Sequence, residues 1–238
     1  MLAIYKREMQ AYFTSPIGYV FLAAFLAING FLFSFCTLLM GEDSSVSSYF
    51  SFMMFAFIIL VPILTMKMFS EERKMRTEQL LLTAPIGLMS MVFGKFLAAL
   101  TMFGGAFVVG NLINFPLLYV YGTETPNTAI LISNSVGILL IGAAFIAMGL
   151  FVSALTENQI VAAICTIGVI LFMLIVGLLN SFIDSYYLRV VLSWISVFSR
   201  FGNFGYGILD LASLLYYFSI CFIFMFLTVR VYEKRRWS

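Results

Sequence analysis

The chain has 238 residues, of which 63% are hydrophobic and only 10% are charged. Soluble domains carry about one quarter charged residues, so this composition indicates a membrane protein. The net charge of +2, without any basic patch interleaved with aromatic residues, argues against a nucleic-acid partner.

Residues 1–16 mix apolar side chains with charged ones and are too polar to cross a bilayer. They predict an amphipathic helix that lies flat in the membrane interface. Thr14, Ser15 and Pro16 are expected to end this helix and turn the chain inward. The apolar run that follows is too long for the core of a cleavable signal peptide, so we interpret it as the first membrane span.

Six apolar runs are long enough to cross a membrane as helices, given that about 20 residues cross the hydrocarbon at about 1.5 Å per residue. We therefore predict an all-α membrane protein with six transmembrane helices. In the fourth of these runs, the spacing of the small residues Gly149 and Ser153 predicts close packing between helices. The predicted spans are residues 17–40, 49–66, 91–121, 128–155, 159–179 and 208–231.

The most highly charged stretch lies between the second and third spans. It cannot stay in hydrocarbon, so it must reach water on one side of the membrane. Ser70 suits a helix N-cap, and Glu71 and Glu72 suit the first turn. Glu72 also precedes Arg76 by the four residues of a helical ion pair. With three leucines and a proline closing it, the stretch predicts a short interfacial helix over residues 70–85.

The outer half of the third span contains polar residues. Asn111 and Asn114 share one helical face beside Pro116, which is expected to interrupt the helix. The simpler interpretation is that each amide bonds a neighbouring helix, as is routine inside membranes. Two amides beside a helix break also suit the wall of a substrate path, and both interpretations stay open.

Residues 180–207, between the fifth and sixth spans, differ from the spans. They combine Asp184, Arg189, Arg200 and Asn203 with aromatic residues, several glycines and apolar residues at helical spacing. This pattern predicts short interfacial or re-entrant helices rather than a full crossing.

The distribution of Lys and Arg predicts the orientation. If the N-terminus is cytoplasmic, eleven of the thirteen lie in cytoplasmic segments, and only Arg189 and Arg200 lie outside. The positive-inside rule therefore predicts a protein of the cytoplasmic membrane with both termini and residues 70–85 in the cytoplasm.

Residues suited to catalysis do not stand out in the chain. It has no histidine, which excludes the HExxH zinc motif, and no span holds two acids. Gly94 and Lys95 form its only Gly-Lys pair, but Met89 and Phe96 stand where a phosphate loop needs Gly and Ser or Thr. We expect neither catalysis nor a bound cofactor or metal. Transport or a scaffold role remains; a channel is disfavoured because no ring-forming charges line any span.

Three stretches carry a resemblance to a known family. They are IYKREMQAYFTSPIGYVF at the start, SEERKMRTEQLLLTAPI followed by Gly94-Lys95, and the closing ISVFSRFGNFGYGILDLASLLYYFSICFIFMFLTVRVYEKRRW. The chain resembles the transmembrane subunits of ABC-2 type transporters, and among them the gliding-motility-type permeases. The middle stretch is the most specific, and the family's positions are filled here by Glu71, Glu72, Arg73, Thr77, Glu78, Leu81, Leu82 and Pro85. Family members usually have Gly just before the Thr, where this chain has Arg76.

The resemblance implies that residues 1–16 form an elbow helix and that residues 70–85 form a coupling helix, which inserts into a cleft of a separate ATP-binding subunit. It implies small re-entrant helices on the outer side before the last span. It also implies a second permease, identical or homologous, and ATP and Mg held only by the partner ATPase. The implied ATPase contact comprises Ser70, Glu71, Glu72, Arg73, Lys74, Arg76, Thr77, Glu78, Leu81, Leu82 and Pro85.

The function expected from this resemblance is that of a permease subunit, in an exporter driven by ATP. The rival is a membrane scaffold or assembly subunit of the same fold that moves no solute. Arg189, Arg200 and the aromatic outer segment suit a lipid, a peptide, a polysaccharide or an extracytoplasmic partner protein equally. The sequence therefore leaves the substrate open.

Overall fold

The protein is helical, and no strand occurs in the part of the chain that the structure describes. The computed structural model describes residues 1–39, 46–79, 87–121, 127–180 and 186–237. The helices are α1 (Leu2–Thr14), α2 (Pro16–Phe33) with a π-helical extension (Ser34–Leu39), α3 (Ser47–Thr65), α4 (Ser70–Lys74), α6 (Leu88–Tyr121), α7 (Thr128–Leu155), α8 (Gln159–Leu179), α9 (Tyr186–Ile195), α10 (Gly202–Gly205) and α11 (Leu211–Trp237).

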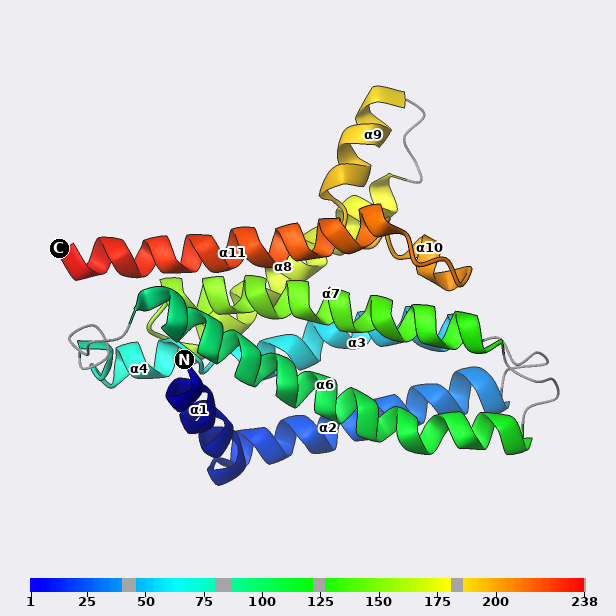
Figure 1. Ribbon diagram of the computed structural model, residues 1–238, viewed down its shortest axis with the longest axis horizontal. Helices are drawn as coiled ribbons and strands as arrows, with labels where there is room; N and C mark the ends of the chain where they lie inside the picture. Colours follow the sequence, from blue (N-terminus) through cyan, green and yellow to red (C-terminus); the bar gives the residue numbers. More distant parts are fainter. Residues whose placement is uncertain (40–45, 80–86, 122–126, 181–185, 238) are drawn as a thin grey trace.

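Six helices in the described residues are long and apolar enough to cross a membrane, which confirms the predicted fold class. They form an elongated bundle with both chain termini at the same end (Figure 1). The helices α7 and α8 begin and end at the predicted residues. Their starts are well defined because the Asn127 and Asn158 side chains accept hydrogen bonds from the Ala129 and Ile160 amides, each at 3.0 Å.

The corner between α1 and α2 forms where the sequence predicts it. Ser15 is extended, with φ −94° and ψ 145°, and Pro16 is the first residue of α2. A proline suits this position because the first amides of a helix lack intrahelical partners. Gly18 is required at this corner, because a Cβ there would lie 2.0 Å from the Tyr12 carbonyl oxygen. The first helix therefore runs across the end of the bundle at a steep angle to α2 (Figure 1).

The central helix of the bundle is α7, which contacts α3, α6, α8, α10 and α11. Its small residues permit this packing. A Cβ on Gly149 would lie 2.4 Å from Thr65 Oγ1, so α3 and α7 approach more closely here than any larger residue allows. Ser153, one turn further on, is fully buried. The close packing predicted for these two positions is confirmed.

Replacing Gly149 by alanine is expected to destabilise the bundle by about 1 to 3 kcal/mol, because the added methyl group overlaps the Thr65 side chain. Gly105 is the matched control, since a Cβ there meets no atom within 4 Å. Alanine at Gly105 is expected to raise stability by up to about 1 kcal/mol, through its higher helix propensity. Thermal unfolding in detergent, followed by circular dichroism, measures both changes. Equal effects of the two substitutions would contradict the close packing.

The interruption predicted at Pro116 and the predicted start of the last span are both wrong. Pro116 does not interrupt α6, which continues to Tyr121. Membrane helices tolerate proline where neighbouring groups adjust to the missing hydrogen bond. The last span begins at Leu211 rather than residue 208, because Asp210 caps it by accepting a hydrogen bond from the Ala212 amide at 3.1 Å.

The stretch over residues 180–207 contains the two short helices α9 and α10, as its pattern indicates. α9 contacts α8 and projects away from the bundle (Figure 1). α10 packs on α7, where a Cβ on Gly137 would lie 2.8 Å from the Phe201 ring. Neither helix has the length to span a membrane.

Candidate functional site at the charged end of the bundle

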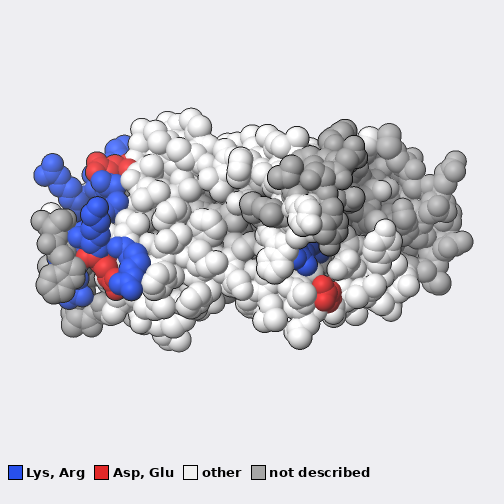
Figure 2. All heavy atoms as spheres, turned by 90° about the horizontal axis from the view of Figure 1, so that it is seen from above, with Lys and Arg blue, Asp and Glu red and all other residues white. Residues whose placement is uncertain are grey.

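Lys, Arg, Asp and Glu gather at one end of the molecule (Figure 2). This charged end is the one that holds both termini and α4 (Figure 1). Ion pairs join its elements across long sequence separations, and they comprise Arg7–Glu72 at 2.6 Å, Arg73–Glu157 at 2.8 Å and Arg235–Glu78 at 3.1 Å. The segment after α3 is therefore bound to the bundle on several sides rather than forming a free loop.

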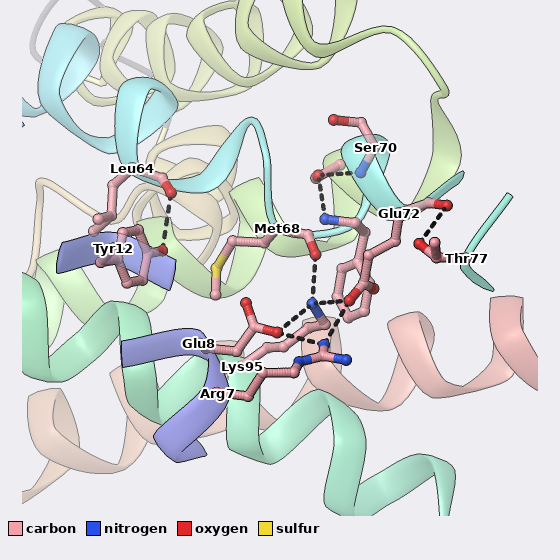
Figure 3. Close-up of polar contacts among 11 residues, drawn as sticks. Arg7, Glu8, Tyr12, Leu64, Met68, Ser70, Glu72, Thr77 and Lys95 are labelled. Carbon is pink, nitrogen blue, oxygen red and sulfur yellow. Dashed lines mark hydrogen bonds and ion pairs between the residues drawn. The ribbon is translucent and has the colours of Figure 1, made fainter. Parts of the chain in front are cut away.

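A buried lysine lies at the centre of this end. Lys95, on α6, is only 1% exposed, and its Nζ lies 3.0 Å from Glu8 Oε1 and 3.0 Å from Glu72 Oε1 (Figure 3). It also donates to the Met68 carbonyl oxygen at 2.7 Å. A charge removed from water persists only when it is paired and hydrogen-bonded in this way.

Arg7 completes the group, which we call the Lys95 cluster: Arg7, Glu8, Glu72 and Lys95. The Arg7 guanidinium lies 2.6 Å from both carboxylates, so two cations face two anions. Burial alone would raise the pKa of Glu8, but the Lys95 ammonium and the Arg7 guanidinium outweigh it and hold that pKa below its usual value. The cluster joins α1, α4 and α6 through contacts that are costly to break.

The start of α4 is held by α7. Ser153 Oγ accepts hydrogen bonds from the backbone amides of Phe69 and Ser70, at 3.1 and 3.2 Å, and donates to the Met66 carbonyl. The prediction that Ser70 is the N-cap is wrong: Phe69 occupies that position, and the Ser70 hydroxyl donates back to Met66. The amides at the start of α4 are thus capped by Ser153 of the neighbouring helix α7, and not by Ser70.

Other residues of the predicted contact set also have partners within the chain. Arg73 donates to the Leu155 carbonyl at 2.9 Å, beside its ion pair with Glu157. Thr77 donates to the Glu72 carbonyl at 3.2 Å. Glu71 Oε2 lies 3.6 Å from Lys67 Nζ.

A turn interrupts the predicted helix over residues 70–85. The helix α4 ends at Lys74, and Arg76 adopts φ +57°, a left-handed conformation that ends an α-helix. The expected Glu72–Arg76 pair is therefore replaced by the contacts of Glu72 within the Lys95 cluster. The turn exposes Lys74, Met75 and Arg76, which we call the basic tip, and Met75 is 66% exposed. Leu81, Leu82 and Pro85 lie outside the described residues.

Asn111 and Asn114 lie in the core between α2, α3 and α6. Asn29 donates to the Tyr49 hydroxyl at 2.9 Å, and Tyr49 donates to Asn111 Oδ1 at 2.9 Å. Asn114 Nδ2 donates to Asn29 Oδ1 at 2.5 Å. Both amides thus bond neighbouring helices, as the simpler interpretation proposed. It stays a prediction that a substrate path is lined by Asn111, Asn114 and Pro116.

Comparison with known proteins decides the family. Residues 2–187 match the family described as ABC-2 family transporter protein. The chain belongs to this family. No curated protein matches the chain.

As a member of the ABC-2 family, the chain is a permease component of an ABC transporter. Such permeases are not themselves catalytic, and they generally work with ABC ATPase subunits and often as dimers. Among the described residues, no group of three or more His, Cys, Asp or Glu could hold a metal ion. The charged end of the permease thus offers long-range ion pairs and an exposed basic tip.

Replacing Arg76 of the permease by glycine is expected to stabilise the fold by about 1 kcal/mol, because a non-glycine residue in the left-handed region carries steric strain. Arg76→Ala is the matched control, because it removes the same charge but keeps the Cβ. Unfolding temperatures of the two variants in detergent separate backbone strain from charge. A gain with alanine equal to that with glycine would contradict the strain argument.

The central position of Lys95 in this site was not predicted from the sequence. In the sequence, Lys95 stands out only beside Gly94, in the stretch that carries the family resemblance and in a pair that does not fit a phosphate loop. The available signal is that Lys95 stands alone in an apolar run. An ionisable residue within a membrane helix needs a partner, and Glu8 and Glu72 are among the few acids in the chain. Which acids would reach it could not be deduced without the fold.

Proposed function

We propose that this chain is the permease subunit of an ABC-2 exporter, and that separate ATPase subunits binding ATP and Mg drive it through the basic tip. The observation that carries this proposal is the position of Glu72. It lies two residues before Lys74, the first residue of the exposed tip, and its carboxylate contacts Lys95 and Arg7 inside the bundle. A partner that grips the tip therefore holds a segment bonded to α1 and α6.

The mechanism follows from the stiffness of this connection. Pulling α4 away would remove Glu72 and leave the two cations Lys95 and Arg7 with the single carboxylate of Glu8, so α4, α1 and the start of α6 are expected to move together. Closure of an ATPase dimer would then tilt these elements as one body, and two paired permeases would rock between two arrangements. The Ser153 contacts extend the same connection to the central helix α7.

The proposed orientation places the charged end in the cytoplasm and the chain in the cytoplasmic membrane. The support is the bias of Lys and Arg toward this end, which also holds both termini. ATP is hydrolysed in the cytoplasm, so the basic tip must face that side for an ATPase to reach it.

Reconstitution tests the proposal against the scaffold rival. The chain is placed in vesicles with its ATPase, and candidate lipids, peptides and glycans are screened for stimulation of ATP hydrolysis and for movement across the bilayer. We expect ATP-dependent movement in one direction that stops when the catalytic glutamate of the ATPase is replaced. A complex that recruits its ATPase but moves no screened compound would favour a scaffold. Movement without ATP would indicate a channel.

A further inference from the structure

A cavity of about 310 Å³ opens beside the Lys95 cluster, between α1, the start of α2, the end of α3 and α4. Its lining combines three charged side chains, Glu8, Lys67 and Glu71, with the apolar side chains of Ile17 and Leu64. A cavity of this size is at the lower end of the range for small-molecule sites. It holds both signs of charge against an apolar wall, which suits an amphipathic ligand with a zwitterionic head.

The residues around the cavity suit the depth of lipid headgroups. Phe13 and Tyr19, on either side of the α1–α2 corner, are 48% and 57% exposed, and their ring centroids are 6.5 Å apart. Tyrosine is enriched at the membrane–water interface, because its ring is apolar and its hydroxyl is polar, and Tyr19 suits that position. Thr14 and Ser15, which belong to the same corner, line the cavity. The cavity therefore opens where polar heads meet acyl chains.

The charged groups of the lining keep hydrogen-bonding capacity. Lys67 Nζ lies 3.6 Å from Glu71 Oε2, which is longer than the 2.7–2.9 Å of a charge-assisted hydrogen bond. Glu8 contacts Arg7 and Lys95 through Oε1, and its other carboxylate oxygen points away from Lys95 (Figure 3). One lysine and two carboxylates thus have room for a further partner.

We propose that this cavity binds the headgroup of a membrane phosphatidylethanolamine. Its primary ammonium fits between the Glu8 and Glu71 carboxylates, which accept N–H bonds, and its phosphate faces the Lys67 ammonium. Its glycerol and upper acyl carbons lie along Ile17 and Leu64. This inference does not rest on the proposed transport function, because lipid binding requires no ATPase.

The same groups discriminate against other lipids. Phosphatidylcholine has no N–H to donate, and a quaternary ammonium is recognised by aromatic cages rather than by carboxylates. Phosphatidylglycerol has no ammonium at all, so its phosphate would face two carboxylates and only one lysine in the lining. The pattern of charges thus selects a lipid that has both a primary ammonium and a phosphate.

The test is lipid retention by the full chain without any ATPase. The protein is assembled in nanodiscs with equal amounts of phosphatidylethanolamine, phosphatidylcholine and phosphatidylglycerol, then released and measured by native mass spectrometry. We expect one retained phosphatidylethanolamine per chain, about tenfold above either other lipid. Glu71→Gln and Lys67→Gln should each lower that retention about tenfold, because each removes one charge-assisted contact. Glu233→Gln is the control, an acid at the same end that pairs with Arg230 away from the cavity lining.

Three results would overturn the assignment. They are equal retention of the three lipids, retention that Glu71→Gln and Glu233→Gln lower alike, and displacement of the lipid by soluble glycerophosphoethanolamine at equal concentration. The last would make a soluble compound the ligand rather than the membrane lipid. Circular dichroism of each variant confirms that the compared proteins are folded.

Discussion

Replacing Lys95 by methionine is expected to destabilise the protein by about 3 to 5 kcal/mol, the cost of breaking a buried ion pair from one side. The methionine fills nearly the same volume, so the loss comes from Glu8 and Glu72. Both carboxylates would stay at a largely buried site, 12% and 18% exposed, with only Arg7 to compensate them. Chemical unfolding in detergent, followed by fluorescence or circular dichroism, measures the change.

Two further variants separate pairing from packing. Lys6→Met removes an exposed charge from α1 and is expected to change stability by less than about 0.5 kcal/mol. The triple variant Lys95→Met, Glu8→Gln, Glu72→Gln removes the unpaired acids as well, and it should regain most of the lost stability. A triple variant no more stable than Lys95→Met alone would show that the charges of the cluster are not what holds α1, α4 and α6 together.

The spans were predictable because the membrane imposes a simple rule. Every backbone group must be bonded within the hydrocarbon, so long apolar runs become helices and polar breaks become their ends. The corner at Pro16 and the starts of α7 and α8 follow from local chemistry that the sequence displays directly. The start of α11 departs by three residues because the Asp210 cap outweighs the apolar pattern before it.

The contacts of the site were not predictable, because they join residues far apart in sequence. Glu72 suits an i,i+4 pair with Arg76, yet it contacts Arg7, 65 residues away. Local pairing at an exposed helix contributes only about 0.3–0.5 kcal/mol, whereas a buried lysine must find acids wherever the fold supplies them. Pairing of Glu72 with the buried Lys95 therefore outweighs its local pair with Arg76. Arg76 takes the left-handed conformation at the turn instead. The capping of α4 likewise depends on a residue far away in sequence, because Ser153 accepts the hydrogen bond from the Ser70 amide.

The structure divides the charged segment into residues that bind the bundle and residues that face outward. Glu72 and Arg73 are engaged with other elements, so reversing their charges would disturb the fold as well as any docking. Lys74, Met75 and Arg76 are exposed. A docking experiment therefore belongs at the basic tip, where a change in partner binding can be separated from a change in folding.

Reversing the tip with Lys74→Glu and Arg76→Glu, together with Met75→Asp, is expected to lower co-purification of the ATPase at least about tenfold. The tip offers one apolar side chain between two cations, which fits an apolar socket with an acidic rim, and the triple change opposes both features. ATP-driven movement in vesicles should fall in parallel. The unfolding temperature should stay within a few degrees of the original, because the Lys95 cluster is untouched.

The matched control reverses a cation at the same end but away from the tip, with Lys6→Glu on α1. If general attraction to the charged end recruits the ATPase, this variant should lose as much binding per charge as the tip variant. If the tip itself docks, Lys6→Glu should keep its ATPase while the tip variant loses it. Full co-purification by a folded tip variant would place the docking surface elsewhere on the charged end. The ATPase would then have to move α4 and Glu72 through a contact other than the basic tip.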